Sequence, residues 1–250
     1  MRTLLCGLFL ASSLASLALA QTPVTPPPGA PAPGRGQPLP QPPAIPSDPE
    51  AQDYAARLEA FQKADVERRI GIQARNLFND PGSAVLGNPN GDVTIVEFFD
   101  YNCPYSRAVE PRVQALLKSD PNVRLILKEF TIENPTTSLT AGRAAFASMK
   151  QGKYQDFHNA LIVVTGHQLT EAEIFENATK VGLNVEQLKK DMEDPSMYNQ
   201  IIKNMTLARA VRAFQTPTFI VNGHIITTPS AQIDFPKLVA EARASNPLKP

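Results

Sequence analysis

Two apolar runs separated by one amphipathic stretch constrain the fold of this chain more than any other feature. The runs Val93–Phe99 (VTIVEFF) and Val123–Phe130 (VRLILKEF) are rich in apolar and β-branched residues and are typical of central strands. Between them, the stretch from Ser106 to Lys118 repeats its valines and leucines at helical spacing. A strand, a helix and a second strand within about 40 residues predict a βαβ unit whose two strands are parallel.

A helical block and a hairpin follow this unit. Residues 136–213 predict helices throughout, divided by glycines and prolines. The expected helices are Thr140–Gln151, Tyr154–Thr165, Glu171–Val181, Val185–Asp194 and Ser196–Phe214. Asn222-Gly223, between the apolar runs Thr218–Val221 and His224–Thr227, predicts a β-hairpin. With a closing helix over Phe235–Ala244, this order predicts an α/β fold with a helical insertion.

The first 49 residues differ in composition from the rest of the chain. Met1–Ala20 combines Arg2, an apolar run and Ala18-Leu19-Ala20, which is the pattern of a secretory signal peptide cleaved after Ala20. A retained membrane anchor is the alternative, since the stretch is about long enough to span a bilayer. Gln21–Pro49 holds half of the 24 prolines and predicts a Pro-rich linker, extended and without a packed core.

Residues 50–80 predict a long helix ahead of the domain, with start signals at Ser47-Asp48-Pro49-Glu50 and a stop at Asn79-Asp80-Pro81-Gly82. Its apolar residues form two offset stripes. The first holds Tyr54, Leu58 and Phe61, and the second holds Val66, Ile70, Ala74 and Leu77. Such a helix either packs on the domain or joins a second copy of the chain, so residues 50–78 are a candidate for homo-oligomer formation.

The cysteines limit the chemistry of the chain. There are two, Cys6 and Cys103, and Cys6 is expected to leave with the signal peptide. Disulfides persist in the compartments that signal peptides lead to, but a single remaining thiol cannot form one within the chain. Cys103 is therefore either buried and inert, paired with another molecule, or reactive.

The residues around Cys103 resemble a known active site. Phe99-Asp100-Tyr101-Asn102 ends a strand and Cys103-Pro104-Tyr105-Ser106 opens a helix, which is similar to the active site of thioredoxin-fold proteins. The helical insertion and Thr216-Pro217-Thr218-Phe219 before the hairpin resemble the DsbA-like thiol:disulfide oxidoreductase family specifically. The resemblance covers residues 84–245 and implies a thioredoxin fold with a helical insertion over 136–213, preceded by an N-terminal helix. Similar exported proteins carry a helical extension that sometimes serves oligomerisation.

One position departs from the family pattern. The family motif is Cys-Pro-x-Cys or close to it, and Ser106 stands where the resolving cysteine would be. Cys103 matches the attacking cysteine and can form a mixed disulfide with a substrate, but another thiol must release it. The resemblance thus implies an isomerase or a monothiol reductase. A net oxidase is disfavoured unless Cys103 first carries a small thiol such as glutathione.

The turn around Cys103 suits a reactive thiol. A sulfur at a helix N-terminus faces unpaired N–H groups and the positive end of the helix dipole, which stabilise a thiolate. Pro104 fits the first helical turn, and Tyr105 completes the turn before Ser106. The hydroxyl of Ser106 can turn towards the sulfur as a further donor.

Three residues outside this turn complete the expected site. Glu97, six residues before Cys103, matches the buried acid of thioredoxin-like sites, where the family uses it to assist proton transfer. Lys128 on the neighbouring strand is its candidate partner. Pro217 is the candidate for the family's cis proline. The backbone of Thr216 is then expected to bind an extended substrate as an added strand.

Charge balance and histidine spacing limit the classes of partner and ligand that can be expected. Lys+Arg and Asp+Glu each number 24, and this net charge of 0 gives no electrostatic case for nucleic acid or an anionic membrane. The three histidines lack metal-ligand spacing and are expected to be solvated or to cap helices, so no metal is predicted. The expected partners are exported proteins with thiols or disulfides and a membrane-bound or soluble thiol redox partner. Two other functions stay open: a non-catalytic periplasmic chaperone or adaptor, and a Cys-to-Ser variant of a dithiol oxidase.

Overall fold

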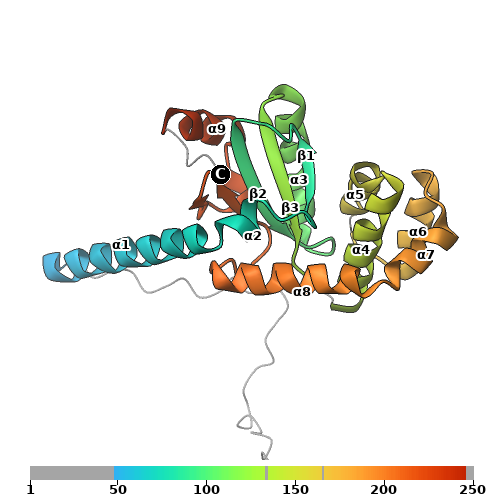
Figure 1. Cartoon of the computed structure of the whole chain (residues 1–250). Helices are drawn as coiled ribbons and strands as arrows, with labels where there is room; N and C mark the ends of the chain where they lie inside the picture. Colours follow the sequence, from blue (N-terminus) through green and yellow to red (C-terminus); the bar gives the residue numbers. More distant parts are fainter. Residues whose placement is uncertain (1–47, 133–134, 165, 246–250) are drawn as a thin grey trace, which may run out of the picture. The chain divides into compact units, whose positions relative to one another are not determined.

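The computed structural model describes residues 48–132, 135–164 and 166–245. The predicted signal peptide and nearly all of the predicted Pro-rich linker therefore lie outside the described residues. Within them, five strands form one sheet in the order β1-β3-β2-β4-β5 (Figure 1). The strands are β1 (Ala84–Gly87), β2 (Val93–Phe99), β3 (Val123–Glu129), β4 (Thr218–Val221) and β5 (His224–Ile225).

The centre of the sheet is the predicted βαβ unit. β2 and β3 run parallel, with Val93 beside Val123 and Phe99 beside Glu129. β4 and β5 form the predicted hairpin, and β4 is antiparallel to β2. β1, antiparallel to β3 on its other side, was not predicted. It has four residues of which only alternate ones are buried, a pattern too short to identify a strand.

Nine α-helices accompany the sheet among the described residues. They are α1 (Pro49–Ile72), α2 (Ala74–Phe78), α3 (Pro104–Ser119), α4 (Pro135–Ser148), α5 (Tyr154–Ile162), α6 (Glu171–Lys180), α7 (Val185–Met192), α8 (Pro195–Ala210) and α9 (Phe235–Ala244). None of these helices is both long and apolar enough to cross a membrane. The element order confirms the predicted α/β fold with a helical insertion. α8 ends at Ala210 rather than at the predicted Phe214, because Arg212 takes a positive φ of 61° that leaves the helical path.

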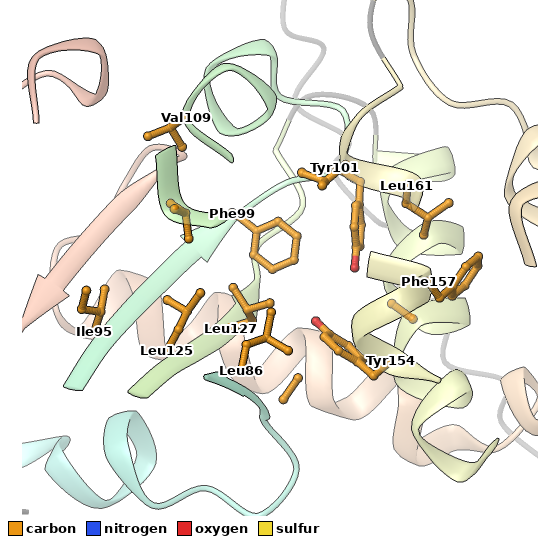
Figure 2. Close-up of a cluster of buried hydrophobic side chains, with 14 of the residues drawn as sticks. Leu86, Ile95, Phe99, Tyr101, Val109, Leu125, Leu127, Tyr154, Phe157 and Leu161 are labelled. Atoms are coloured by element: carbon orange, nitrogen blue, oxygen red, sulfur yellow. The ribbon is translucent and has the colours of Figure 1, made fainter. Parts of the chain in front are cut away.

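Helices cover both faces of the sheet. α3 and α9 pack on the face that carries Ile95 and Phe99, and this core continues into the insertion helices. Figure 2 shows it between the sheet and the helices of the insertion. α2, α8 and the end of α1 pack around Val96 and Phe98 on the opposite face. β2 is buried along its whole length, and the turn that leads to Cys103 and α3 follows it directly.

The N-terminal helix is split, and its two apolar stripes have different surroundings. α1 ends at Ile72 and Gln73 separates it from α2, so the single helix predicted over residues 50–80 is two helices. The second stripe packs on the domain, with Ile70 and Leu77 buried. The first stripe is in solvent: Tyr54, Leu58 and Phe61 are 69%, 43% and 71% exposed. The helix therefore packs on the domain and also leaves an apolar face open.

Candidate active site

Cys103 lies at the junction between β2 and α3. It is the N-cap residue of α3, with φ −74° and ψ 119°, and its carbonyl accepts a hydrogen bond from the N–H of Arg107. Its own N–H donates to the carbonyl of Asp100, which closes the turn between strand and helix. Pro104 suits the first helical position, where an N–H would have no partner within the helix. The sulfur therefore lies at the end of the helix that favours negative charge.

A second segment, distant in sequence, meets the sulfur. Sγ of Cys103 donates to the carbonyl of Thr216 over 3.2 Å, and the Thr216–Pro217 peptide bond is cis, as predicted. Thr216 precedes β4, so its backbone N–H lies outside the ladder that β4 forms with β2. Two of the predicted site segments are thus in direct contact.

The thiol is enclosed, whereas apolar side chains near it are exposed. Cys103 is 1% exposed and forms no disulfide. Tyr105, two residues further on, is 66% exposed, and Phe214, two residues before Thr216, is 65% exposed. The exposed rings thus lie close in sequence to a thiol and a carbonyl that are in contact with each other.

Ser106 contacts the end of the strand. The residue is buried, and its Oγ accepts a hydrogen bond from the backbone N–H of Asp100 at 3.4 Å. The described contact of this hydroxyl is therefore with the turn rather than with the sulfur of Cys103. In this position Ser106 holds the first turn of α3 against the end of β2.

Polar side chains that were not predicted as site residues from the sequence stabilise the turn before Cys103. The carboxylate of Asp100 accepts from the N–H of Asn102 (2.9 Å), the hydroxyl of Ser138 (2.6 Å) and the N–H of Ile132 (2.6 Å). Asn102 in turn donates through Nδ2 to the Ser138 hydroxyl over 3.0 Å. The sequence did contain a signal for this turn: an aspartate and an asparagine stand between a strand and a helix, and both residue types stabilise turns through their side chains.

Glu97 is buried in the core that α3 covers. It is 1% exposed, and its Oε2 has no hydrogen-bond partner among the described residues. Burial raises the pKa of Glu97 well above its usual range, and the carboxylate of Glu110 on α3 raises it further. Burial thus favours the protonated form of Glu97, on the side of the sheet that faces the helix of Cys103.

The predicted pairing of Glu97 with Lys128 is wrong. In the parallel register Glu97 lies beside Leu127, and Lys128 lies beside Phe98. Side chains alternate between the two faces of a sheet, so Lys128 points to the face opposite Glu97. There its Nζ donates to the hydroxyl of Ser83 over 2.6 Å and to a carbonyl of α2 over 2.7 Å.

A buried chain of polar groups joins β3, the active-site turn and the insertion. The hydroxyl of Tyr101 lies 3.1 Å from Nδ1 of His158, and Figure 2 shows the hydroxyl ends of Tyr101 and Tyr154 turned towards each other. Tyr154 donates to Glu129 over 2.7 Å. Nε2 of His158 is 3.6 Å from the carboxylate of Glu110. Because His158 is 1% exposed, the expectation that it is solvated or caps a helix is wrong.

The other two histidines are exposed and each lies beside one glutamate. His167 is 2.6 Å from Glu173, and His224 is 3.0 Å from Glu67. Within residues 48–132, 135–164 and 166–245, no group of three or more His, Cys, Asp or Glu side chains is arranged to hold a metal ion.

Comparison with known proteins identifies similar sequences and folds. A model of the Thioredoxin family matches residues 79–241. A thioredoxin-like oxidoreductase of Silicibacter pomeroyi is 44% identical, with 68% of this chain and 97% of that chain covered and a TM-score of 0.62. A periplasmic thioredoxin-like protein of Salmonella enterica is 27% identical, with 69% and 95% covered and a TM-score of 0.60. At 21% identity, the thiol-disulfide exchange protein alpha-DsbA2 of Wolbachia pipientis has the same fold, with 74% and 98% covered and a TM-score of 0.66.

The curated relatives that the chain first matches are much longer proteins. The Na(+)/H(+) antiporter NhaA 3 of Salinispora tropica is 28% identical over 168 residues, which make up 66% of this chain but 26% of the antiporter. The chain thus spans about a quarter of the length of the curated relatives that it first matches.

Proposed function

Since the chain belongs to the thioredoxin family, we propose that it is a DsbA-like thiol-disulfide oxidoreductase, exported, which exchanges protein disulfides through Cys103 alone. One observation carries the proposal: Cys103 lies at the N-terminus of α3, with its sulfur 3.2 Å from the carbonyl of Thr216. Ser106, at the place of the second cysteine of the family motif, leaves one thiol to do the chemistry.

The exchange begins with the thiolate of Cys103, which the N-terminus of α3 stabilises. The thiolate attacks one sulfur of a substrate disulfide, the S–S bond breaks, and the other substrate sulfur leaves as a thiolate that takes up a proton. Cys103 and the substrate are then joined in a mixed disulfide. A thiolate of the same substrate attacks this bond, forms a new substrate disulfide and releases Cys103. The substrate disulfide is moved with no net oxidation.

A small thiol such as glutathione offers a reductive route. One glutathione displaces the substrate thiol from the mixed disulfide and becomes joined to Cys103. A second glutathione then displaces Cys103 and leaves as glutathione disulfide. The substrate disulfide is reduced by two electrons and two glutathiones are oxidised. A membrane-bound or soluble thiol protein serves as redox partner in the same way.

The remaining site residues support this chemistry in the proposal. Pro104 and Tyr105 shape the first turn of α3, and the exposed ring of Tyr105 contacts the substrate. The backbone of Thr216, beside Pro217, pairs with an extended stretch of substrate, which suits an N–H that lies outside the sheet ladder. Glu97, as a buried acid, assists proton transfer at the site.

Export and assembly are part of the same proposal. A signal peptide over residues 1–20 would deliver the protein to the periplasm, where substrates with exposed thiols and disulfides fold. The exposed stripe of α1 supports a homo-oligomer through residues 50–78, because three large apolar side chains in solvent favour burial against another copy. Paired active sites could then engage one misfolded substrate.

A reshuffling assay tests the proposed function. The chain from Gln21 onward is incubated with a protein whose disulfides have been scrambled, and recovery of the native disulfides is followed together with the mass of any mixed disulfide. We expect recovery with the native protein, none with Cys103→Ser, and little net oxidation of a fully reduced substrate. Catalytic oxidation of reduced substrate without an added small disulfide would rule out the single-thiol mechanism.

One observation favours a second function, that of a chaperone or adaptor without redox turnover. Cys103 is 1% exposed, so a peptide can bind beside residues 214–218 without reaching the sulfur. In that case Cys103→Ser would suppress aggregation of a denatured, reduced protein as well as the native chain does. Neither protein would reshuffle disulfides.

A further inference from the structure

Arg107 is a buried cation one helical turn after Cys103. It belongs to the first turns of α3, where its N–H donates to the carbonyl of Cys103, and it is 8% exposed. Arginine is rarely buried unless its donors are paired, because desolvation of an unpaired charge is costly. The surroundings of this guanidinium therefore define what the residue does.

The guanidinium is paired through all three of its nitrogens. Nε donates to the carbonyl of Tyr101 over 2.6 Å, and Nη2 donates to Oδ1 of Asn102 over 3.1 Å. Both acceptors belong to the turn that leads into Cys103. Nη1 donates to the carbonyl of His167 over 2.6 Å, in the segment that precedes α6. One side chain thus joins the active-site turn to the helical insertion.

Asn102 extends this connection. Its Oδ1 accepts from the N–H of Leu169 over 2.7 Å as well as from Arg107. Its Nδ2 donates to the hydroxyl of Thr137 over 2.9 Å, at the start of α4. The turn before Cys103 is therefore fastened to two separate elements of the insertion, and Arg107 supplies the only cation among these contacts within the described residues.

The charge of Arg107 lies against the turn that carries Cys103, because the guanidinium binds the carbonyl of Tyr101 and the side chain of Asn102, the two residues before the cysteine. Burial lowers the pKa of the guanidinium, and the charges of Asp100, Cys103 and Glu173 oppose that effect. Interaction between charges is mutual, so a cation stabilised by the Cys103 thiolate also stabilises the thiolate. The low exposure of both residues reduces the screening of this attraction by water and salt.

We propose that Arg107 is a positioning residue for Cys103: its guanidinium fastens the turn before the cysteine to the insertion, and its positive charge favours the thiolate. This inference deepens the proposed function and rests on Cys103 as the nucleophile. It assigns the stabilisation of the thiolate to a side chain as well as to the N-terminus of α3.

The test measures the rate at which iodoacetamide alkylates Cys103 between pH 4 and pH 10. Removal of the charge in Arg107→Gln should move the midpoint of the pH profile to a pH about one unit higher, which is the shift that loss of a nearby opposite charge produces. Alkylation at pH 6 should then be about tenfold slower. Arg107→Lys keeps the charge and loses the paired donors. It should lower the unfolding temperature while the pH profile stays within about 0.3 units of the native one.

Arg112→Gln is the matched control. Arg112 is also on α3 and donates to the backbone carbonyls of Ser230, Ala231 and Ile233, away from the active-site turn. We expect its loss to reduce stability without moving the pH profile. The other charges that face this region, Asp100, Glu173 with His167, and Glu97 with Glu110, are unchanged in all variants.

Each outcome separates the inference from the proposed function. A profile of Arg107→Gln that coincides with the native one overturns the inference, even if Cys103 is reactive. If Arg107→Gln does not fold, a full-unit shift in Arg107→Lys overturns it, because the charge is still present. A native Cys103 whose alkylation profile has its midpoint at no lower pH than that of the urea-unfolded chain contradicts the proposed function itself.

Discussion

The sulfur of Cys103 and the carbonyl oxygen of Thr216 lie 3.2 Å apart, although 113 residues separate them along the chain. The thiol is the donor in this contact. Attack on a disulfide requires a thiolate, and the contact must therefore break as the reaction begins. The segment proposed to receive the substrate is the same segment that covers the nucleophile.

Restoring a second cysteine should convert the chemistry from exchange to oxidation. In Ser106→Cys, the two sulfurs occupy the first turn of α3, and we expect an intramolecular disulfide that raises oxidation of a reduced peptide by at least about tenfold. Mass analysis checks the disulfide by a loss of two hydrogens. Ser119→Cys, at the far end of the same helix, adds a thiol away from the site and should leave oxidation unchanged. Equal activity of the two variants would contradict the assignment of position 106.

The buried carboxyl of Glu129 should make stability fall with rising pH. Burial raises the pKa of Glu129 to about 8 from 4.5, while the hydroxyl of Tyr154 donates to one of its oxygens. Between pH 4.5 and pH 8 the unfolded chain loses this proton and the folded chain keeps it, so unfolding becomes more favourable as pH rises. The loss of stability that Glu129 causes is absent below pH 4.5 and complete above pH 8.

The variant Glu129→Gln tests this pH dependence of stability, because it removes the titrating carboxyl group and keeps a polar side chain. The free energy of unfolding of the variant, minus that of the native protein, should increase from pH 5 to pH 8 by a few kcal/mol, since each pKa unit corresponds to about 1.4 kcal/mol. Urea denaturation at several pH values gives this difference. Glu97 titrates in both proteins, so its contribution cancels. A difference that is constant with pH would mean that Glu129 is ionised in the folded protein.

Lys128 should be among the most sensitive charged residues of the fold. It is fully buried, and its Nζ is 2.6 Å from the hydroxyl of Ser83 and 3.5 Å from the carboxylate of Asp80. Lys128→Met leaves these groups without their buried cation, and we expect a loss of about 3 kcal/mol in the free energy of unfolding. Lys203→Met is the control, because Lys203 pairs with the same carboxylate over 2.7 Å but is 42% exposed.

The control variant should lose less than about 1 kcal/mol, the usual contribution of an exposed ion pair. Chemical denaturation of both variants at pH 7 provides the comparison. Equal losses would show that the burial of Lys128 does not set its contribution.

The parallel strands β2 and β3 illustrate which features of the fold could be predicted from the sequence and which could not. β2 was predicted at its observed residues because a run of apolar and β-branched side chains is a local signal. The direction of Lys128 depends on the register between strands, which places it beside Phe98 rather than beside Glu97. A register follows from turn lengths and from packing on both faces of the sheet. No single run of residues contains that information.

The candidate site likewise combines residues that local motifs predict with residues whose contacts only the fold reveals. Cys103, Thr216 and Pro217 could be predicted because short motifs mark them. The roles of Arg107 and His158 come from contacts that bridge the active-site turn and the insertion, 60 and 57 residues apart in the chain. A lone arginine or histidine on an amphipathic helix carries no pattern that identifies such a partner.

The exposed stripe of α1 leads to a prediction about assembly, and the structure decides how to test it. Deletion of everything before Ser83 would also remove Ile70 and Leu77, which are buried against the sheet, and would destabilise the domain. Substitution of the exposed stripe alone avoids this problem. A chain in which Tyr54, Leu58 and Phe61 are all replaced by serine keeps the packed half of α1.

We expect light scattering to show an oligomer for the native chain from Gln21 onward and a monomer for the triple serine variant, because burial of the stripe against another copy is the driving force. The unfolding temperature of the domain should change little, since these three side chains are exposed in the fold. A control variant carries serine at exposed positions on the opposite side of α1, namely Gln52, Ala56 and Lys63. It loses at least as much helix propensity as the stripe variant does and should nevertheless remain an oligomer. If the native chain is itself a monomer, or if both variants dissociate equally, the stripe is not a surface for self-association and each active site works alone.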